Sequence, residues 1–490
     1  MIGTNIHLMI GLESHIQLAT KSKLFCSCST NSSAEPNENT CEICLGYPGT
    51  KPTLNKEVVR KALMLAKIMN CKINYNSKFN RKIYFYPDLP KSFQITQYEE
   101  PIAVKGEFSI DVSASRLPNG ANLSGAALDH SATAATEKKT IHITRAHIEE
   151  DPGKIEYVGG HIGTAKYVLV DYNRCGVPLC EVVTDPDFRS IDEAVTYVKK
   201  LFHLLSYLDI IDPNQEGVMR TDANISINGG KRVELKNISG SDALEKALKS
   251  ELSRQSFLFA QGKVIEQETR MYSEETGTTI LLRKKEQEED YGYIREPDLL
   301  PITIDDAFVQ DAWKQMKKLP EEVESEIISK YKLSKQIAYQ LAFKRGLYAY
   351  YQSCLKYLKN SDLLAKWLVG DFLKCANWHN YEIEKCPSSE KLIEFMQMIE
   401  TGKISEREGK ELIKKMFDDP KKGLGDLAEK KGVDLDSVIS EVLKENQKSV
   451  DQIKAGDPKA INFLIGQVLR KAGFKGDPNE IRKKLEKLLT

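Results

Sequence analysis

The sequence predicts an α+β fold with three parts in chain order: a large N-terminal cradle domain built on a mainly antiparallel β-sheet with helices, an all-α helical domain, and a small all-α tail domain. Up to about residue 240, short segments of alternating apolar and polar residues are separated by Gly, Asn and Pro turns, which is typical of an antiparallel sheet. After Pro301 the apolar residues follow a helical period. We expect the domains to span residues 1–298, 299–408 and 409–490.

Individual helices are assigned from apolar residues that recur every three or four positions. In the cradle domain we expect helices at 58–70, 190–208 and 241–261, packed against the sheet. Pro320, with two acids beside it, suits the first turn of a helix, because proline lacks an amide that such a turn leaves unpaired. The other expected helices are 307–319, 337–343, 348–358, 363–373 and one between about 386 and 411, and residues 418–423 are a candidate hinge before the tail.

Composition and charge narrow the class of protein. Lys plus Arg equals Asp plus Glu, 70 of each in 490 residues, so the net charge gives no argument for a nucleic-acid partner. The first residues lack the basic and apolar regions of a secretory signal, and no run approaches the ~18 apolar residues that span a membrane. We therefore expect a cytoplasmic protein with no membrane partner.

Four of the ten cysteines form two close pairs. Cys26 and Cys28 are separated by one residue, Cys41 and Cys44 by two, and a polar loop joins the pairs. This spacing suits tetrahedral zinc, and in a reducing compartment it indicates metal rather than disulfides. With sulfur at all four positions the zinc would be structural. The alternative is a chance cluster of reduced thiols.

Polar side chains follow one face of two apolar strands. In residues 10–18 the two-residue period places Glu13, His15 and Gln17 on one face. In residues 141–151 the same period groups Arg145, His147 and Glu149, and three successive acids end the segment. Carboxylates with an imidazole suit Mg²⁺ carried in with a nucleotide. A solvated strand end with charged residues remains the alternative reading.

Two loops carry basic residues that suit phosphate. Residues 171–181 surround a Gly and a Pro with charged groups, and a turn there can aim the Arg174 guanidinium at phosphate in bidentate fashion. Residues 81–91 place Lys82 and Lys91 around three consecutive aromatics, which can stack a base. A surface salt bridge for Arg174 and core packing for the aromatics are the ordinary alternatives.

A hairpin is expected over residues 218–237. A three-residue loop at 228–230 would set Ser226 opposite Arg232, Asn224 opposite Glu234 and Asp222 opposite Lys236, so that every polar side chain shares one face. A two-residue loop would mix the polar and core faces. This face would also carry Arg220, and we expect it to lie on the side of Glu13 and His15. An ordinary solvent-exposed hairpin would show the same alternation.

Missing motifs limit how a nucleotide could bind. The sequence has no P-loop, no complete dinucleotide fingerprint and no G-x-S-x-G nucleophile elbow. Any ATP would therefore be held by side chains on strands and by metal.

Seven collinear motifs resemble the B subunit of the glutamyl/aspartyl-tRNA amidotransferase. They are GLESH (11–15), CEICLGYPG (41–49), RKIYFYPDLPK (81–91), ITRAHIEED (143–151), DYNRCGVP (171–178), MRTDAN (219–224) and VELKN (233–237). KWLVG (366–370) resembles that family's helical domain, and DPKAINFLIGQ (457–467) resembles its C-terminal tail. The resemblance covers essentially the whole chain.

The resemblance implies a reaction, partners and site residues. ATP would phosphorylate the side-chain carboxylate of Glu on tRNA(Gln) or Asp on tRNA(Asn), and ammonia would displace the phosphate. A glutaminase A subunit would supply the ammonia, and a small C subunit would clasp the two. The implied Mg²⁺ ligands are Glu13, His15, Glu149 and Glu150, and the residues implied to stabilise phosphate are Lys82, Arg174, Arg220 and Lys236. Together with Asp222, Asn224 and Glu234 of the predicted hairpin face, these four are the candidate catalytic residues.

The last residues of the chain are locally basic. Residues 456–490 contain eight Lys or Arg and four acids, and such a segment suits the phosphates of a tRNA body. The candidate contacts are Lys459, Arg470, Lys471 and Lys475.

Three segments depart from the family's pattern. Residues 237–241 lack the usual aromatic, 269–272 lack a Gly-Trp pair, and 290–298 replace an Arg and a Phe, so the pocket wall is expected to differ there. The competing hypothesis is a zinc-containing tRNA-binding protein without catalysis.

Overall fold

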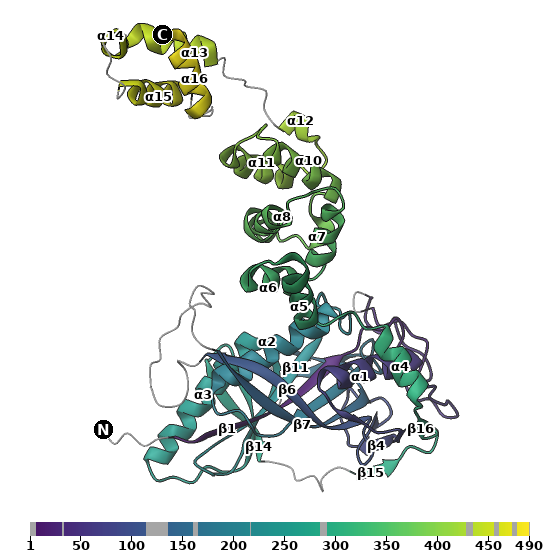
Figure 1. The fold of residues 1–490 in the computed structure, drawn as a ribbon. Coiled ribbons are helices and arrows are strands. Elements are labelled where there is room, and N and C mark those ends of the chain that lie inside the picture. The colour runs from purple at the N-terminus through teal and green to yellow at the C-terminus, as the bar shows by residue number, and fades with distance from the viewer. Residues whose placement is uncertain are drawn as a thin grey trace. The chain divides into compact units, whose positions relative to one another are not determined.

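The computed structural model describes residues 6–31, 34–113, 136–159, 165–215, 217–284, 292–427, 435–454, 460–472 and 478–489. The chain divides into two compact units, residues 1–345 and 346–490. The first unit contains the β-structure and the second is helical (Figure 1), so the predicted α+β class is confirmed. The predicted domain boundaries after residues 298 and 408 remain predictions. No helix among the described residues is both long and apolar enough to cross a bilayer.

The first unit is organised by a nine-stranded sheet in the order β14-β13-β12-β11-β1-β10-β7-β6-β2. All neighbouring strands are antiparallel except β12 and β13. Its strands are β1 (Leu8–Gln17), β2 (Lys72–Ile73), β6 (Ala103–Ser113), β7 (Thr136–Glu150), β10 (Pro178–Thr184), β11 (Met219–Ile227), β12 (Val233–Ser239), β13 (Glu268–Ser273) and β14 (Thr278–Lys284).

Smaller sheets lie beside the large one. A three-stranded sheet has the order β15-β4-β5, and two-stranded sheets join β16 to β3 and β8 to β9. These strands are β3 (Asn76–Ser77), β4 (Asn80–Ile83), β5 (Phe93–Thr96), β8 (Lys154–Val158), β9 (Tyr167–Asp171), β15 (Gly292–Arg295) and β16 (Ile302–Thr303).

Three helices cover the apolar face of the large sheet, as predicted. They are α1 (Lys56–Ile68), α2 (Ile191–Tyr207) and α3 (Ser241–Ala260), and they share one hydrophobic core with the strands. On β1 this core takes Ile10, Leu12 and Ile16, and the alternation of a strand leaves Glu13 and His15 on the other face. The large sheet therefore has one packed face and one polar face.

Helices also complete the first unit. α4 (Asp306–Lys314), α5 (Pro320–Tyr331) and α6 (Lys335–Phe343) follow the β-structure. The predicted helix 307–319 is wrong at its end, because Leu319 has an extended backbone with ψ 148°, as expected for the residue before a proline.

The second unit consists of helices. They are α7 (Leu347–Leu355), α8 (Ser361–Trp367), a π-helical turn (Leu368–Phe372), α9 (Leu373–Trp378), a short 3₁₀ turn (Ile383–Lys385), α10 (Ser389–Glu400), α11 (Glu406–Asp418), α12 (Leu424–Leu427), α13 (Leu435–Glu445), α14 (Gln447–Lys454), α15 (Ala460–Lys471) and α16 (Pro478–Leu489). Helices α13 to α16 share a small apolar core of their own.

Two helix predictions in this unit need correction. The predicted helix 363–373 is interrupted at Gly370, whose backbone (φ −90°, ψ −106°) is not helical. The single helix expected between about 386 and 411 is two helices, because Gly402 has φ 69° and Ser405 caps the start of α11 with Glu408.

The β11–β12 hairpin confirms part of the predicted register. Asn224 lies opposite Glu234 and Ile225 opposite Val233, which is the register predicted for a three-residue loop, but the ladder ends there and does not include the predicted pair of Ser226 with Arg232. The chain turns at Asn228 and Gly229, whose φ values are 50° and 70°, and the Gly230 amide donates to the Ile227 carbonyl at 2.9 Å. On the other edge of β11, Asn228 exchanges hydrogen bonds with His7 and extends the β1–β11 ladder.

A β-bulge also alters the predicted hairpin pairing of Asp222 with Lys236. The register shifts between Thr221 and Ala223, so Asp222 has no single partner on β12. Its carboxylate still lies 3.3 Å from the Lys236 ammonium. The predicted backbone opposition of Asp222 and Lys236 is therefore wrong, although their side chains lie in contact.

Candidate active site and metal centres

Four neighbouring strands place a continuous row of polar residues across the polar face. His147 on β7 lies opposite Glu181 on β10, Glu181 opposite His15 on β1, and His15 opposite Arg220 on β11. Adjacent strands are ~4.8 Å apart, so such a row brings its side chains into contact. Arg145, predicted to share this face with His147, lies two residues earlier on β7.

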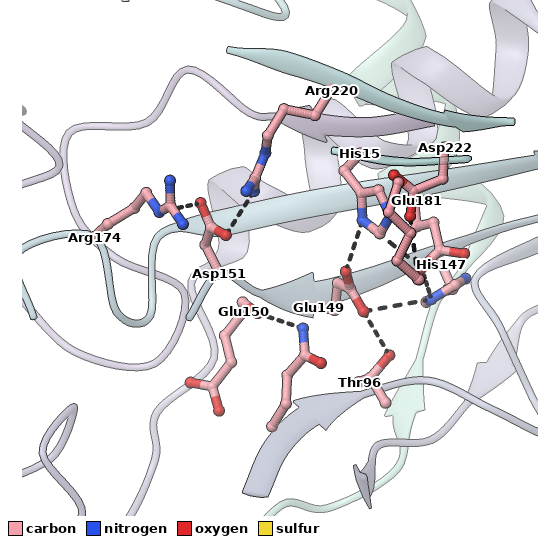
Figure 2. A network of polar contacts seen from close by, with 12 residues as sticks. His15, Thr96, His147, Glu149, Glu150, Asp151, Arg174, Glu181, Arg220 and Asp222 are labelled. Atoms are coloured by element: carbon pink, nitrogen blue, oxygen red, sulfur yellow. Dashed lines mark hydrogen bonds and ion pairs between the residues drawn. The ribbon is translucent and has the colours of Figure 1, made fainter. Parts of the chain in front are cut away.

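Two imidazoles and two carboxylates form the centre of this row (Figure 2). His15 Nδ1 lies 3.2 Å from Glu149 Oε1 and 3.9 Å from Glu181 Oε2. His147 Nε2 lies 3.3 Å from Glu181 Oε2 and 3.7 Å from Glu149 Oε2. Thr96 donates a hydrogen bond of 3.2 Å to Glu149. We call His15, His147, Glu149 and Glu181 the imidazole–carboxylate cluster.

The charges within the cluster shift every one of its pKa values. Burial lowers the pKa of His15 and of His147, but Glu181 and Glu149 outweigh it and raise each to about 9. Burial raises the pKa of Glu181, but the two imidazoles outweigh it and lower the value to about 2. The pKa of Glu149 is likewise held well below its ordinary value by the two histidines, against burial. At neutral pH the ligand-free cluster therefore holds two imidazolium–carboxylate pairs.

The donor set fits a divalent cation. One nitrogen of His15 and one oxygen each of Glu149 and Glu181 lie within 4.8 Å of one another, and ~2.1 Å bonds to Mg²⁺ allow ligand atoms up to ~4.2 Å apart. His147 Nδ1 and Asn224 Oδ1 are buried and have no hydrogen-bond partner in the part of the chain that the structure describes. Unpaired buried polar atoms are costly in a folded protein, and here they accompany a site that a polar ligand could complete.

A second group of charges borders the cluster on β11 and β12. Asn224 donates a hydrogen bond of 3.0 Å to Glu13, and Lys236 Nζ lies 3.3 Å from Asp222 and 3.1 Å from Glu234. Burial and then the charges of Glu181, Asp222 and Glu234 raise the pKa of Glu13. Burial lowers the pKa of Lys236, but Asp222 and Glu234 outweigh it and raise it. Thr269 donates to Glu234 at 3.0 Å.

Two arginines meet at a single carboxylate. Asp151, 2% exposed, lies 3.1 Å from Nε of Arg174 and 2.7 Å from a terminal nitrogen of Arg220 (Figure 2). Arg174 also donates to the carbonyl groups of Pro152 and Gly153. Both guanidiniums therefore have fixed positions beside the cluster.

Lys82 lies on the three-stranded sheet β15-β4-β5. On β4 it lies opposite Tyr293 on β15 and Gln94 on β5. Its ammonium is 5.7 Å from the centre of the Tyr84 ring, and Tyr293 stacks on Tyr98 at 4.1 Å. Burial raises the pKa of Tyr293, and Glu181 and Glu149 add to this while Lys82 opposes it. The hydrogen bond from Thr96 on β5 to Glu149 places this sheet beside the cluster.

Glu150 belongs to a different environment from the other predicted magnesium ligands. Its carboxylate accepts hydrogen bonds from Lys91, one of 2.7 Å, and from the Ile95 amide at 2.8 Å. It lines a cavity of about 200 Å³ whose wall also includes Lys91, Cys26 and Cys44. The structure thus brings together Glu13, His15 and Glu149, whereas Glu150 faces the cavity that Cys26 and Cys44 also line.

The four predicted zinc ligands come together. The sulfur atoms of Cys26, Cys28, Cys41 and Cys44 all lie within 4.8 Å of one another, and tetrahedral zinc with ~2.3 Å bonds requires sulfurs ~3.8 Å apart. Hydrogen bonding between Cys26 and Cys44 raises the pKa of the first and lowers that of the second to about 4. The cluster could therefore hold zinc with little rearrangement.

The predicted tail residues are only partly described. Lys459 and Lys475 lie outside the described residues. Arg470 is exposed at the end of α15, and Lys471 beside it forms an ion pair of 3.2 Å with Glu441 and another with Glu445.

Three residues of the site were not among the predicted ligands or catalytic residues: Glu181, His147 and Asp151. Glu181 offered a signal, because it is a lone carboxylate between Cys180 and Val182 in an otherwise apolar strand. Asp151 follows β7 and acquires its role only through Arg174 and Arg220, which come from distant segments.

Comparison with known proteins agrees with this geometry. Residues 8–310 match the GatB/GatE catalytic domain, and residues 349–489 match the GatB domain. The chain is 39% identical over 501 residues to the aspartyl/glutamyl-tRNA(Asn/Gln) amidotransferase B subunit of Methanospirillum hungatei, with 99% of each chain covered. It is 37% identical over 503 residues to the B subunit of the same name from Clostridium beijerinckii, again with 99% of each chain covered. The chain therefore belongs to the family of the aspartyl/glutamyl-tRNA(Asn/Gln) amidotransferase B subunits.

Proposed function

We propose that the protein uses ATP to activate the side-chain carboxylate of Glu on tRNA(Gln), or of Asp on tRNA(Asn), and then amidates it. The observation that carries the proposal is the imidazole–carboxylate cluster beside Arg174, Arg220 and Lys236, on the polar face of the sheet. A site with these charges can hold phosphate groups and a cation together. Family membership supplies the substrate class.

The reaction has two steps. A carboxylate oxygen of the aminoacyl side chain attacks the γ-phosphorus of ATP, the bond to the β-phosphate oxygen breaks, and ADP leaves. Ammonia then attacks the acyl carbon, the bond to the phosphorylated oxygen breaks, and phosphate leaves with that oxygen while a proton is released. Positioning and charge neutralisation dominate catalysis of phosphoryl transfer.

Each group of residues has a task in this scheme. His15, Glu149 and Glu181 would hold Mg²⁺, with Glu13 close by, and the ion would neutralise charge on the phosphate oxygens. Arg174, Arg220, Lys82 and Lys236 stabilise the negative charge on the transferred phosphoryl group. Asp222, Asn224 and Glu234 orient Lys236 and Glu13, with which they form ion pairs and a hydrogen bond.

Partners and metal complete the proposal. A glutaminase A subunit provides ammonia and a small C subunit joins the assembly, as expected for one subunit of an amidotransferase. Zinc at Cys26, Cys28, Cys41 and Cys44 has a structural role. Residues 409–490 bind the tRNA body, with Lys459, Arg470, Lys471 and Lys475 as candidate contacts.

The test combines the product nucleotide with an oxygen label. The full complex is incubated with ATP, Mg²⁺, glutamine and Glu-tRNA(Gln) carrying ¹⁸O in the side-chain carboxylate. The proposal requires ADP rather than AMP, together with one ¹⁸O atom in the released phosphate. Glu-tRNA(Glu) serves as the control and should stimulate little ADP formation. Tight binding of misacylated tRNA without ATP consumption would instead identify a non-catalytic tRNA-binding protein.

A further inference from the structure

Lys23 is a lysine without access to solvent, with an exposed fraction of 0%. Its ammonium donates to the carbonyl oxygen of Asn39 at 2.7 Å, to that of Tyr172 at 3.3 Å and to the sulfur of Cys44 at 3.6 Å. Two of these three acceptors are neutral. The third is a predicted zinc ligand.

A buried ammonium needs a compensating negative charge. None of the acceptors of Lys23 is a carboxylate. We therefore expect the negative charge that compensates its ammonium to come from the cysteine sulfurs. Four thiolates around one Zn²⁺ carry a formal charge of about −2, and the sulfur nearest to Lys23 belongs to this set. The lysine and the loaded cysteine site would therefore neutralise part of each other's charge.

The same lysine connects two loops. Between the cysteine pairs, Asn37 exchanges hydrogen bonds with Asp171 and Tyr172 at 2.9 and 2.8 Å, and the Asn39 amide donates to Asn173 at 2.7 Å. Lys23 adds a bond to the main chain of each loop at their junction. Residues 171–173, which these hydrogen bonds hold in place, are followed directly by Arg174.

Gly176 links Lys23 and Cys44 to Asp151. Gly176 has φ +84°, and a Cβ there would lie 3.6 Å from Cys44 and 3.6 Å from the Lys23 side chain. Its amide donates to the Asp151 carbonyl and its carbonyl accepts from Leu24, both at 2.9 Å. Asp151 in turn holds Arg174 and Arg220.

We propose that Lys23 is the outer-sphere cation of the cysteine zinc site and that it couples zinc loading to the position of residues 171–174, and so to Arg174. This inference rests on the proposed structural zinc but not on the amidation reaction. Lys23 is a positioning residue in this scheme, because it acts through Cys44 and the Tyr172 carbonyl.

The experiment uses the full chain loaded with zinc. Lys23→Met keeps the length of the side chain and removes its charge, Lys23→Arg keeps the charge, and Lys21→Met alters an exposed lysine nearby. Zinc affinity is measured by competition with a coloured chelator, and hydrogen exchange is followed in peptides covering residues 170–176. Loss of an outer-sphere partner commonly costs 10 to 100-fold in metal affinity, so Lys23→Met should bind zinc about tenfold or more weakly and exchange faster at 170–176.

The variants distinguish a role of the Lys23 charge in zinc binding from a general effect of substitution. Lys23→Arg should retain most of the zinc affinity, and Lys21→Met should behave as the wild type. Wild-type affinity and protection in Lys23→Met would overturn the proposal, as would a wild-type protein that binds no zinc. If Lys23→Met does not fold, chelation of the wild-type protein decides: exchange at 170–176 must rise, and unchanged exchange refutes the coupling. ADP formation in the assembled complex tests the proposed reaction separately.

Discussion

A terminal nitrogen of Arg220 lies 2.7 Å from Oδ1 of Asp151. Because Asp151 also holds Arg174, its replacement should release both guanidiniums. We predict that Asp151→Asn lowers kcat for tRNA-dependent ADP formation by about 100-fold, the effect expected when reacting groups are misplaced by about 1 Å. Asp187→Asn, which removes the surface pair with His142, is the matched control. A wild-type rate in Asp151→Asn would mean that the arginines keep their positions without it.

Glu181 and Glu150 should differ in their effect on magnesium dependence. Glu181 contacts both imidazoles of the cluster, whereas Glu150 faces Lys91. We predict that Glu181→Gln raises the Mg²⁺ concentration for half-maximal ADP formation by about tenfold or more, and that Glu150→Gln leaves this concentration near the wild-type value. Titration of both variants with Mg²⁺ checks the assignment, and the reverse pattern would show that the cation is held elsewhere.

His203 should make the contact between α2 and α6 sensitive to acid. Its ring stacks on Phe343 at 5.9 Å, and its Nε2 is buried without a hydrogen-bond partner among the described residues. Burial lowers the pKa of His203, against hydrogen bonding to the Phe343 backbone. The unfolded chain therefore takes up a proton that the folded chain resists as the pH falls below about 6.5, and stability is lost in that direction.

The measurement for His203 is the Tm between pH 8 and pH 5. The wild type should lose about 2–4 °C more than His203→Phe over this range, which corresponds to roughly 1 kcal/mol. His7→Asn, which removes an exposed histidine, is the control for general acid effects. Parallel curves for the wild type and His203→Phe would contradict the prediction.

Arg470 and Lys471 should contribute unequally to tRNA binding. Arg470 is exposed, whereas Lys471 is paired with Glu441 and Glu445. Each phosphate contact contributes about one unit to the slope of log K against log salt. We predict that Arg470→Ala reduces this slope by about one and that Lys471→Ala changes it less. Equal slopes in Arg470→Ala and the wild type would exclude Arg470 as a phosphate contact.

The spacing of residues along the sequence was sufficient to predict several features of the molecule. The alternation in residues 10–18 placed Glu13 and His15 on one face, and the two cysteine pairs indicated a tetrathiolate site. The register of Asn224 with Glu234 followed from keeping polar residues together. Other features could not be predicted from spacing: the β-bulge at Asp222 and the end of the β11–β12 ladder at Ile225 and Val233 are local irregularities in a pairing that the alternation of residues makes regular.

The sequence by itself therefore determined the α+β class, the polar strand faces and the cysteine quartet, because each is encoded over a few neighbouring residues. Tertiary structure decided that Glu181 joins His15, that Glu150 turns toward Lys91, and that Asp151 serves two arginines. The physical reason is the order and register of β7, β10, β1 and β11 in the sheet. His15 and Glu149 are separated by 134 residues, and only strand pairing across that distance brings their side chains within a hydrogen bond of each other.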